Sequence, residues 1–146
     1  MNYLALEPLI IDRLKTEVPT LRAVLSADAL ADLAEGVQTT PAAYVLYDGD
    51  DVPSADGKRA GDGARQLVSQ RWLVVLAVRN ARGGSDARED AGPLLTQILA
   101  ALAGYHPQPA PPSQVYRPLK RAQAPRPGYH AGYGYFPLLF TTEVLT

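Results

Sequence analysis

Cysteine is missing from this chain of 146 residues. Without a thiol, the chain forms no disulfide, builds no zinc site from cysteines and has no cysteine nucleophile. Long apolar runs are missing as well, since the longest, from Trp72 to Val78, has only the length of a strand. A membrane-spanning helix requires about 20 apolar residues, and the first residues lack the basic start and apolar run of a signal peptide. We therefore expect no membrane partner.

A strong net charge is also missing. The chain has 14 Lys/Arg and 15 Asp/Glu, a net charge of -1, so no overall basic field favours nucleic acid. The charge is uneven, however: residues 1–62 contain 5 basic and 11 acidic side chains, whereas residues 105–146 contain 4 basic and 1 acidic. Such a chain can place an acidic patch of one copy against a basic patch of the next. Loops that simply differ in charge would give the same distribution, so both interpretations stay open.

Two segments bear a superficial likeness to ligand sites. The stretch from Asp48 begins like a calcium loop, but an EF-hand requires Gly at position 6 and Glu at position 12, and these places hold Pro53 and Arg59. The glycine-rich residues 57–63 contain one lysine, but they lack the spacing of a phosphate-binding loop and precede a strand instead of a helix. We therefore expect no metal and no cofactor.

The two histidines, His106 and His130, are the remaining candidates for catalysis. Each follows a tyrosine among turn residues, and two isolated histidines are too few ligands for a zinc site. No serine lies in the Gly-x-Ser-x-Gly elbow that a hydrolase nucleophile would occupy. The sequence therefore predicts no catalytic residue and no enzyme.

The spacing of apolar residues predicts an α+β domain. The elements follow the order α, β, α, β, β, α, β, β. Helices are expected over residues 3–17, 28–34 and 86–103, and strands over residues 21–25, 41–47, 66–79, 115–124 and 133–144. This order favours a mixed, mainly antiparallel β-sheet flanked by helices. A single domain is expected to span residues 1–146, with a flexible loop at about 48–64.

Several details of these elements are also predicted. The strand over 66–79 is apolar on both faces, so we expect a helix on one face and a second helix or a neighbouring subunit on the other. Pro137 indicates that the closing strand lies at a sheet edge or contains a bulge. Gly92 and Pro93 predict a kink or restart of the long helix, which Gly104 should cap.

A basic and aromatic arm occupies the last quarter of the chain. Its candidate interface residues are Arg117, Lys120, Arg121, Tyr129, Tyr133 and Tyr135. Such residues can bind single-stranded nucleic acid by stacking and phosphate contact. Tyrosine and arginine are also enriched at protein–protein interfaces. The arm has four basic residues with Arg126 included, which are few for a nucleic-acid site. We favour a protein interface.

The order of these features resembles the tail terminator proteins of tailed bacteriophages. The motifs that carry the resemblance are the amphipathic N-terminal helix, the Ala/Leu-rich segment 27–33, Pro41-Ala-Ala-Tyr-Val-Leu46, the apolar strand 72–78, Leu102-Ala-Gly-Tyr-His-Pro107 and the ending Tyr135-Phe-Pro-Leu-Leu-Phe140. They cover nearly the whole chain, although each is low in specificity. Tyr105 departs from the family's usual tryptophan.

The resemblance implies a structural virion protein. Such a protein forms a ring, usually of six copies, that caps the tail tube, ends tube polymerisation and offers a surface to the head or neck. The implied partners are the chain itself, the tail tube protein and a neck or head-completion protein, with DNA only in transit through the ring. The implied location is the head-proximal end of the tail, after assembly in the bacterial host cytoplasm.

Alternatives remain at this stage. The chain could be another ring protein of the neck or tail, such as a head–tail joining component, a small nucleic-acid-binding module or, least supported, a small enzyme. For a ring, we expect acidic side chains to face the lumen and discourage DNA from sticking; the candidates are Asp48, Asp50, Asp51 and Asp56.

Overall fold

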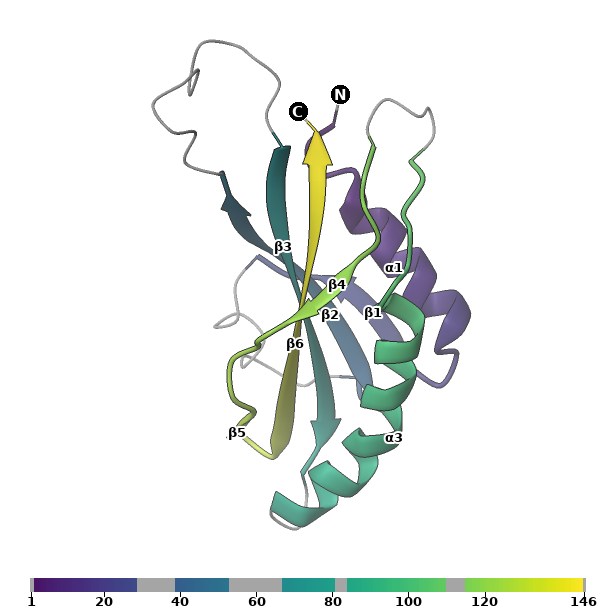
Figure 1. Cartoon of the computed structure of the whole chain (residues 1–146). Coiled ribbons are helices and arrows are strands. Elements are labelled where there is room, and N and C mark those ends of the chain that lie inside the picture. Colours follow the sequence, from purple (N-terminus) through teal and green to yellow (C-terminus); the bar gives the residue numbers. More distant parts are fainter. Residues whose placement is uncertain (1, 29–38, 53–66, 81–83, 110–114, 146) are drawn as a thin grey trace.

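The computed structural model describes residues 2–28, 39–52, 67–80, 84–109 and 115–145 (Figure 1). These residues form two helices and a six-stranded, mostly antiparallel sheet, which confirms the predicted α+β class. The helices are α1 (Leu6–Glu17) and α3 (Gly84–Leu102), and the strands are β1 (Ala23–Ser26), β2 (Ala42–Asp51), β3 (Leu67–Arg79), β4 (Lys120–Ala122), β5 (Gly128–His130) and β6 (Tyr133–Leu145). The helix expected over residues 28–34 lies almost entirely outside the described residues.

The sheet has the strand order β1-β2-β3-β6-β4, and β5 also pairs with β6. Only β1 and β2 are parallel, and every other described pair is antiparallel. The longest pairing joins β3 to β6 from Leu67–Leu145 to Arg79–Tyr133 without a register shift. The sheet is therefore organised around β3 and β6, which are 13 residues long each.

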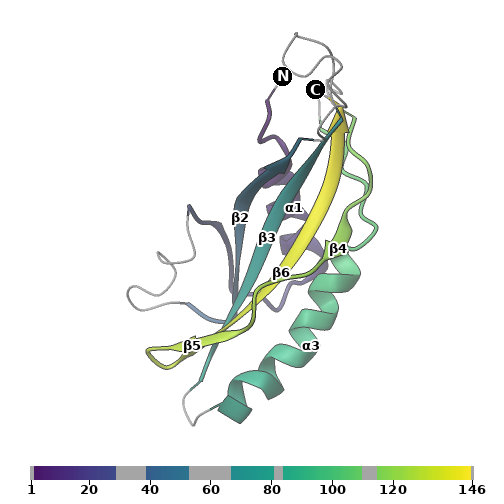
Figure 2. The same ribbon diagram turned by 60° about the vertical axis from the view of Figure 1, so that its left-hand side comes forward.

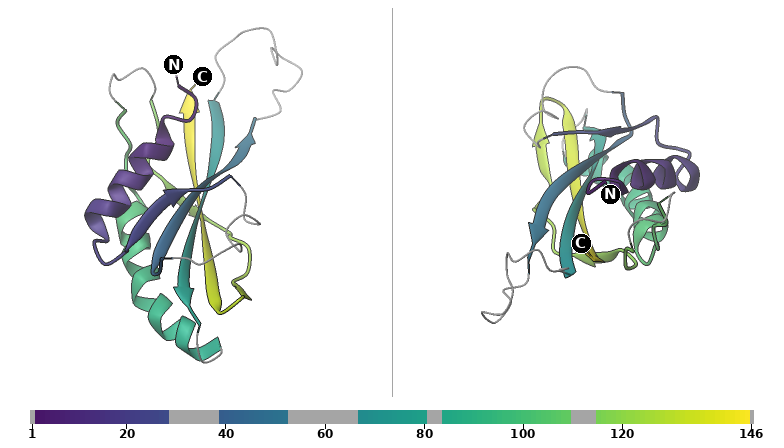
Figure 3. Two further views of the ribbon diagram at one scale, coloured as in Figure 1. Left: turned by 180° about the vertical axis from the view of Figure 1, so that it is seen from behind. Right: turned by 90° about the horizontal axis from the view of Figure 1, so that it is seen from above.

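Both described helices pack on the same face of the sheet (Figures 2 and 3). Helix α1 buries Leu6, Ile10 and Leu14, as its apolar spacing predicts. The main core joins these side chains to the central strands, where Trp72 and Phe140 are fully buried. None of the described helices is long and apolar enough to cross a membrane.

Strand β3 is buried on both faces from Trp72 to Val78, as predicted. Its second face, which carries no described helix, bears a smaller cluster made of Leu46, Leu73 and Val75. Tyr44 and Tyr135 pack against this cluster and are themselves half-buried. A second helix over this face is therefore not found among the described residues.

Strand β2 continues four residues past its predicted end, so the expected loop does not begin at Asp48. Between Tyr47 and Asp50 the register with β3 shifts by one residue. Gly49 has a φ of +86° there, a conformation that glycine adopts at little cost and that occurs at one type of β-bulge. The bulge absorbs the extra residue and lets the polar end of β2 stay paired.

Helix α3 runs through Pro93 as one helix, so the predicted restart is wrong. Proline removes a backbone donor. The helix nevertheless continues, because Ala91 before Pro93 and Ile98 after it are both buried against the core. Gly104 has a φ of +81° and its N–H donates to the carbonyl oxygen of Leu119 at 2.8 Å. This confirms Gly104 as the cap of the helix.

The C-terminal part differs most from expectation. The strand predicted over residues 115–124 is reduced to β4 and an isolated bridge between Tyr116 and Val144. Pro118, which has no N–H, lies between them. The hydrogen-bonding groups of Leu119 turn away from β6 to the end of α3, where they bond Gly104 and Tyr105.

Strand β6 is not a sheet edge, and that prediction is wrong. Its outer side pairs with β4 near Leu139 and with β5, which the sequence analysis missed, near Tyr135. One face of β6 is turned inward, since Gly134, Phe136, Leu138, Phe140 and Val144 are all buried. Pro137 lies in the short gap between β4 and β5. No strand pairs with β6 on this side there, so the N–H that proline lacks is not needed for a hydrogen bond.

Substitution of Gly134 by alanine should destabilise the fold. A Cβ atom there would lie 2.9 Å from Cβ of Ala87 in α3, with further close contacts to Phe136 and Tyr129. We expect a loss of about 1–3 kcal/mol in the free energy of unfolding, measured by urea titration. Gly92→Ala is the matched control: no atom lies within 4 Å of its added Cβ, so this helix position should gain about 0.5–1 kcal/mol. Equal effects of the two changes would contradict this packing.

Candidate assembly surface

The six predicted interface residues all lie along the outer edge of β6, but in two separate groups. Arg117, Lys120 and Arg121 flank its C-terminal half, and Tyr129, Tyr133 and Tyr135 lie at the hairpin formed with β5. The structure thus brings them to one side of the sheet without merging them into one patch.

The basic group is not a continuous stripe. Arg117 forms an ion pair with Glu143 at 3.1 Å, and its carbonyl oxygen accepts a hydrogen bond from Oγ1 of Thr142 at 2.6 Å. Lys120 pairs with Thr141 and Arg121 with Phe140, so their side chains point to opposite faces of the sheet. This arrangement disfavours a single phosphate-binding track, which requires aligned charges.

The tyrosine group surrounds a tight hairpin. Ala131 and Gly132 have φ values of +51° and +83°, the two positive angles that a two-residue type I′ turn requires. Tyr129 on β5 contacts Phe136 edge-on, with ring centroids 6.1 Å apart. Its side chain is 46% exposed, so the hairpin presents an aromatic surface to solvent.

A cavity of about 250 Å³ lies between this hairpin and the central sheet. Val75, Tyr135 and Pro137 line it from the face without described helices, and Arg126 and His130 line it from the connection and β5. A second hollow lies on the helix side, between Leu95, Phe136 and Leu138. The segment between β4 and β5 therefore passes Pro137 without forming backbone pairs with it.

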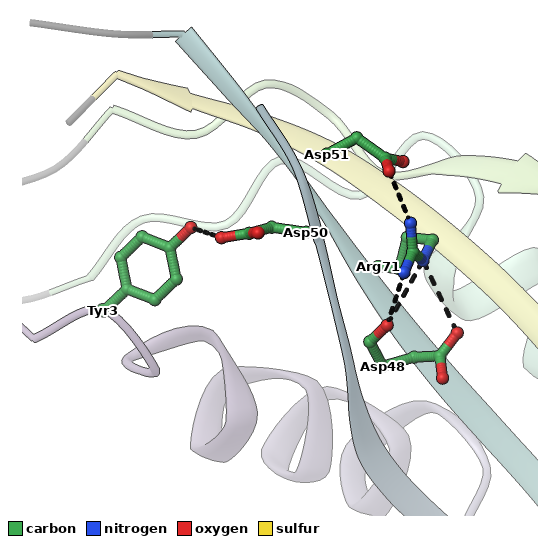
Figure 4. A network of polar contacts seen from close by, with 5 residues as sticks. All are labelled: Tyr3, Asp48, Asp50, Asp51 and Arg71. Atoms are coloured by element: carbon green, nitrogen blue, oxygen red, sulfur yellow. Dashed lines mark hydrogen bonds and ion pairs between the residues drawn. The ribbon is translucent and has the colours of Figure 1, made fainter. Parts of the chain in front are cut away.

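The acidic candidates lie at the far end of β2 (Figure 4). Nη1 of Arg71 binds Oδ1 of Asp51 at 2.7 Å, and Nη2 of Arg71 donates to the carbonyl oxygen of Asp48 at 3.0 Å. Asp50 instead accepts a hydrogen bond from the hydroxyl of Tyr3. Asp56 lies outside the described residues. Each of the three described aspartates thus has a partner, and Arg71 spans the bulge.

A polar network that the sequence analysis missed holds the N-terminal segment on the sheet. Gln70 is fully buried; its Nε2 donates to the carbonyl oxygen of Tyr3 at 2.9 Å, and its Oε1 accepts from Nε1 of Trp72 at 3.2 Å. Beside it, the ring of Tyr47 contacts that of Tyr3 edge-on and that of Trp72 at a tilt of 56°. Gln70 lies in the polar run Ser69-Gln70-Arg71 of an otherwise apolar strand, but its partner 67 residues away could not be read from spacing.

The same contacts alter proton binding. Burial, followed by the hydrogen bond to Asp50, raises the pKa of the Tyr3 hydroxyl far above its usual value. Burial also raises the pKa of Tyr44, Tyr47 and Tyr116. The hydroxyls of these four tyrosines therefore lose their protons at a higher pH than a free tyrosine does.

The histidines occupy no catalytic arrangement in the described part of the chain. His106 and His130 are both exposed and lie on separate elements, after α3 and on β5. Among the residues that the structure places, no three acidic or histidine side chains converge as metal ligands.

The whole chain matches one protein family. The family described as "Phage tail terminator protein" matches residues 1–146. The chain belongs to this family. Terminator-family membership places it among the structural proteins of phage tails and confirms the resemblance seen in the sequence.

Two solved structures share the fold of this chain. A chain from the "Virion of native gene transfer agent (GTA) particle" has a TM-score of 0.58 and 17% identity, covering 99% of this chain and 100% of its own length. A second solved chain has a TM-score of 0.51 and 17% identity, with coverage of 97% and 91%. Identities this low show the fold alone. A comparison with curated proteins gave no match.

The buried glutamine supplies a test of the N-terminal network. Gln70→Leu leaves the indole N–H of Trp72 and the carbonyl of Tyr3 without a partner. We expect a loss of about 1–3 kcal/mol in the free energy of unfolding, measured by urea titration. Gln123→Leu, at an exposed position, is the control and should change stability by less than about 0.5 kcal/mol. A neutral Gln70→Leu would show that the network contributes nothing.

Alkaline pH supplies a second test. Because the folded pKa values of four tyrosines exceed the unfolded value of about 10, the folded state keeps more protons above that pH. The free energy of unfolding should therefore be constant with respect to these groups below about pH 9 and fall above about pH 10. Urea titrations across this range measure the fall, and tyrosinate absorbance measures delayed ionisation in the folded protein.

Tyr116→Phe sharpens the alkaline test. Tyr116 is 1% exposed and its hydroxyl has no hydrogen-bond partner among the described residues. Its removal should make the alkaline fall shallower without large loss at neutral pH. An unchanged slope would contradict the raised pKa.

Proposed function

We propose that this chain forms a ring, of six copies, that caps the phage tail tube and ends its polymerisation. The observation that carries the proposal is the terminator-family match over residues 1–146. The proposed partners are further copies of the chain, the tail tube protein and a neck or head-completion protein. DNA passes only in transit, and the protein has no catalytic role.

The distribution of exposed side chains supports an assembly role. The outer edge of β6 carries three tyrosines beside a cavity, and Lys120 and Arg121 extend from it without an acidic partner in the described part of the chain. Tyrosine and arginine are favoured at protein interfaces. We place the ring at the head-proximal end of the tail, after assembly in the host cytoplasm.

An acidic lumen remains a prediction. Asp48 and Asp51 share Arg71, and Asp50 binds a neutral hydroxyl. The compensated charge at Asp48 and Asp51 makes this end of β2 less negative than the sequence suggests. A lumen lined by this end would therefore repel DNA less strongly.

The proposal is tested with purified chain and its tail tube protein. Light scattering of the isolated chain should give about six times the subunit mass of 15.7 kDa. Electron microscopy should show rings on one end of each tube and shorter tubes than in a reaction without the chain. Tubes that grow to the same length, with no ring at their ends, would overturn the proposal.

The same samples separate the alternatives. A ring that binds the neck protein but not the tube would favour a head–tail joining component. Binding to single-stranded nucleic acid that weakens steeply with salt would favour the nucleic-acid module. Neither outcome is expected from the divided basic group.

A further inference from the structure

The two edges of the sheet carry different apolar features on the same face. Strand β1 forms one edge, and Leu25 on it is 50% exposed. Leu25 pairs with Tyr44, whose side chain packs on the cluster of Leu46, Leu73 and Val75. Leu25 therefore lies on the face without described helices, as an exposed aliphatic side chain at the rim of the sheet.

The opposite edge has a matching hollow on that face. The cavity beside β5 is lined by Val75, Tyr135 and Pro137 and bordered by Arg126. Its volume of about 250 Å³ lies below the roughly 300–1,000 Å³ of typical small-molecule sites. A hollow of this size and lining accepts one or two apolar side chains from another protein.

The charges of the two edges are opposite. Asp28 is the one charged residue of the described stretch 23–28, which forms and follows β1, whereas residues 115–130 contain four basic and no acidic side chains. Within the described part of the chain, Arg117 alone of these four has an acidic partner. Asp28, next to β1, likewise has no described ion-pair partner.

We infer that the β1 edge of one copy docks against the β5 side of the next, with Leu25 in the cavity and Asp28 facing Arg126. The inference rests on the proposed ring. A closed ring needs two different, complementary surfaces on each subunit, and these edges supply both halves on one chain. The complementary charges are the reason to assign the cavity to a second copy and not to the tail tube.

Backbone pairing between copies at β6 is not part of this interface. On its outer side β6 already pairs with β4 and with β5, and Pro137, which lies between these two pairings, has no N–H to donate to another strand. The contact is instead made by side chains, which place an apolar centre within a charged rim, as in other protein interfaces.

The absence of cysteine makes the interface testable by directed cross-linking. A variant with Ala27→Cys and His130→Cys keeps Leu25, Asp28 and Arg126. It places one thiol at each edge on the face without described helices, because Ala27 packs on the cluster of that face and His130 lines its cavity. The two edges are four strand spacings apart, roughly 19 Å, so a thiol cross-linker shorter than this cannot join them within one chain. In assembled protein we expect a ladder of covalent oligomers that stops at the ring size.

The matched control moves one thiol to the helix side. Lys15→Cys with His130→Cys puts the first thiol on an exposed position of α1, and it should give no ladder above background. A ladder equal in the two variants, or absent from both in assembled protein, would overturn the interface.

Charge exchange gives an independent readout. Asp28→Arg and Arg126→Asp should each reduce the assembled fraction at low salt, because each places like charges together. The combined variant should restore it. Circular dichroism checks that each variant is folded, and unchanged assembly in both single variants would overturn the inference.

These outcomes separate the interface from the function. If the unmodified chain caps tubes as a ring but shows neither the ladder nor the charge effect, the interface is wrong and the proposed function stands. If the unmodified chain forms no ring even on tubes, both are overturned.

Discussion

The burial of β3 on both faces is the constraint on which the rest of the structure depends. From Trp72 to Val78 no side chain of this strand reaches solvent, so the chain must supply cover on two sides. On one side α1 and α3 provide it, and the uninterrupted pairing with β6 fixes which residues of the C-terminal strand face them. On the other side a small cluster and two tyrosines remain near the surface, and this is the face on which we propose that neighbouring copies meet.

The regular elements could be predicted from sequence because their apolar spacing is local. Residues 3–17 and 66–79 show the repeats of a helix and a doubly buried strand, and Gly104 shows the usual cap of a helix end. The bulge at Gly49 could not be predicted, since it depends on the register with a strand more than 20 residues later. Strand β5 could not be predicted either, because it is three residues long and all three are exposed, so it has no apolar pattern.

The candidate site was predicted in composition but not in arrangement. The tyrosines and basic residues of the last quarter do lie on one side of the sheet, yet the alternation of strand side chains sends Lys120 and Arg121 to opposite faces. Pro137 predicted a sheet edge or a bulge, and both are wrong: β6 pairs with β3 without a register shift, and Pro137 lies opposite a gap between two short strands. Partners distant in sequence, such as Tyr3 with Gln70 or Arg71 with Asp51, become visible only once the register is known.

Pro137 also bears on aggregation. Exposed strands with free donors recruit further strands without limit, which is the route to fibres. Here β4 and β5 shield both ends of the outer side of β6, and Pro137, in the middle of the gap between them, has no N–H to donate. In the proposed ring, neighbouring copies meet through side chains, and the covered outer side of β6 offers no template for unlimited strand addition.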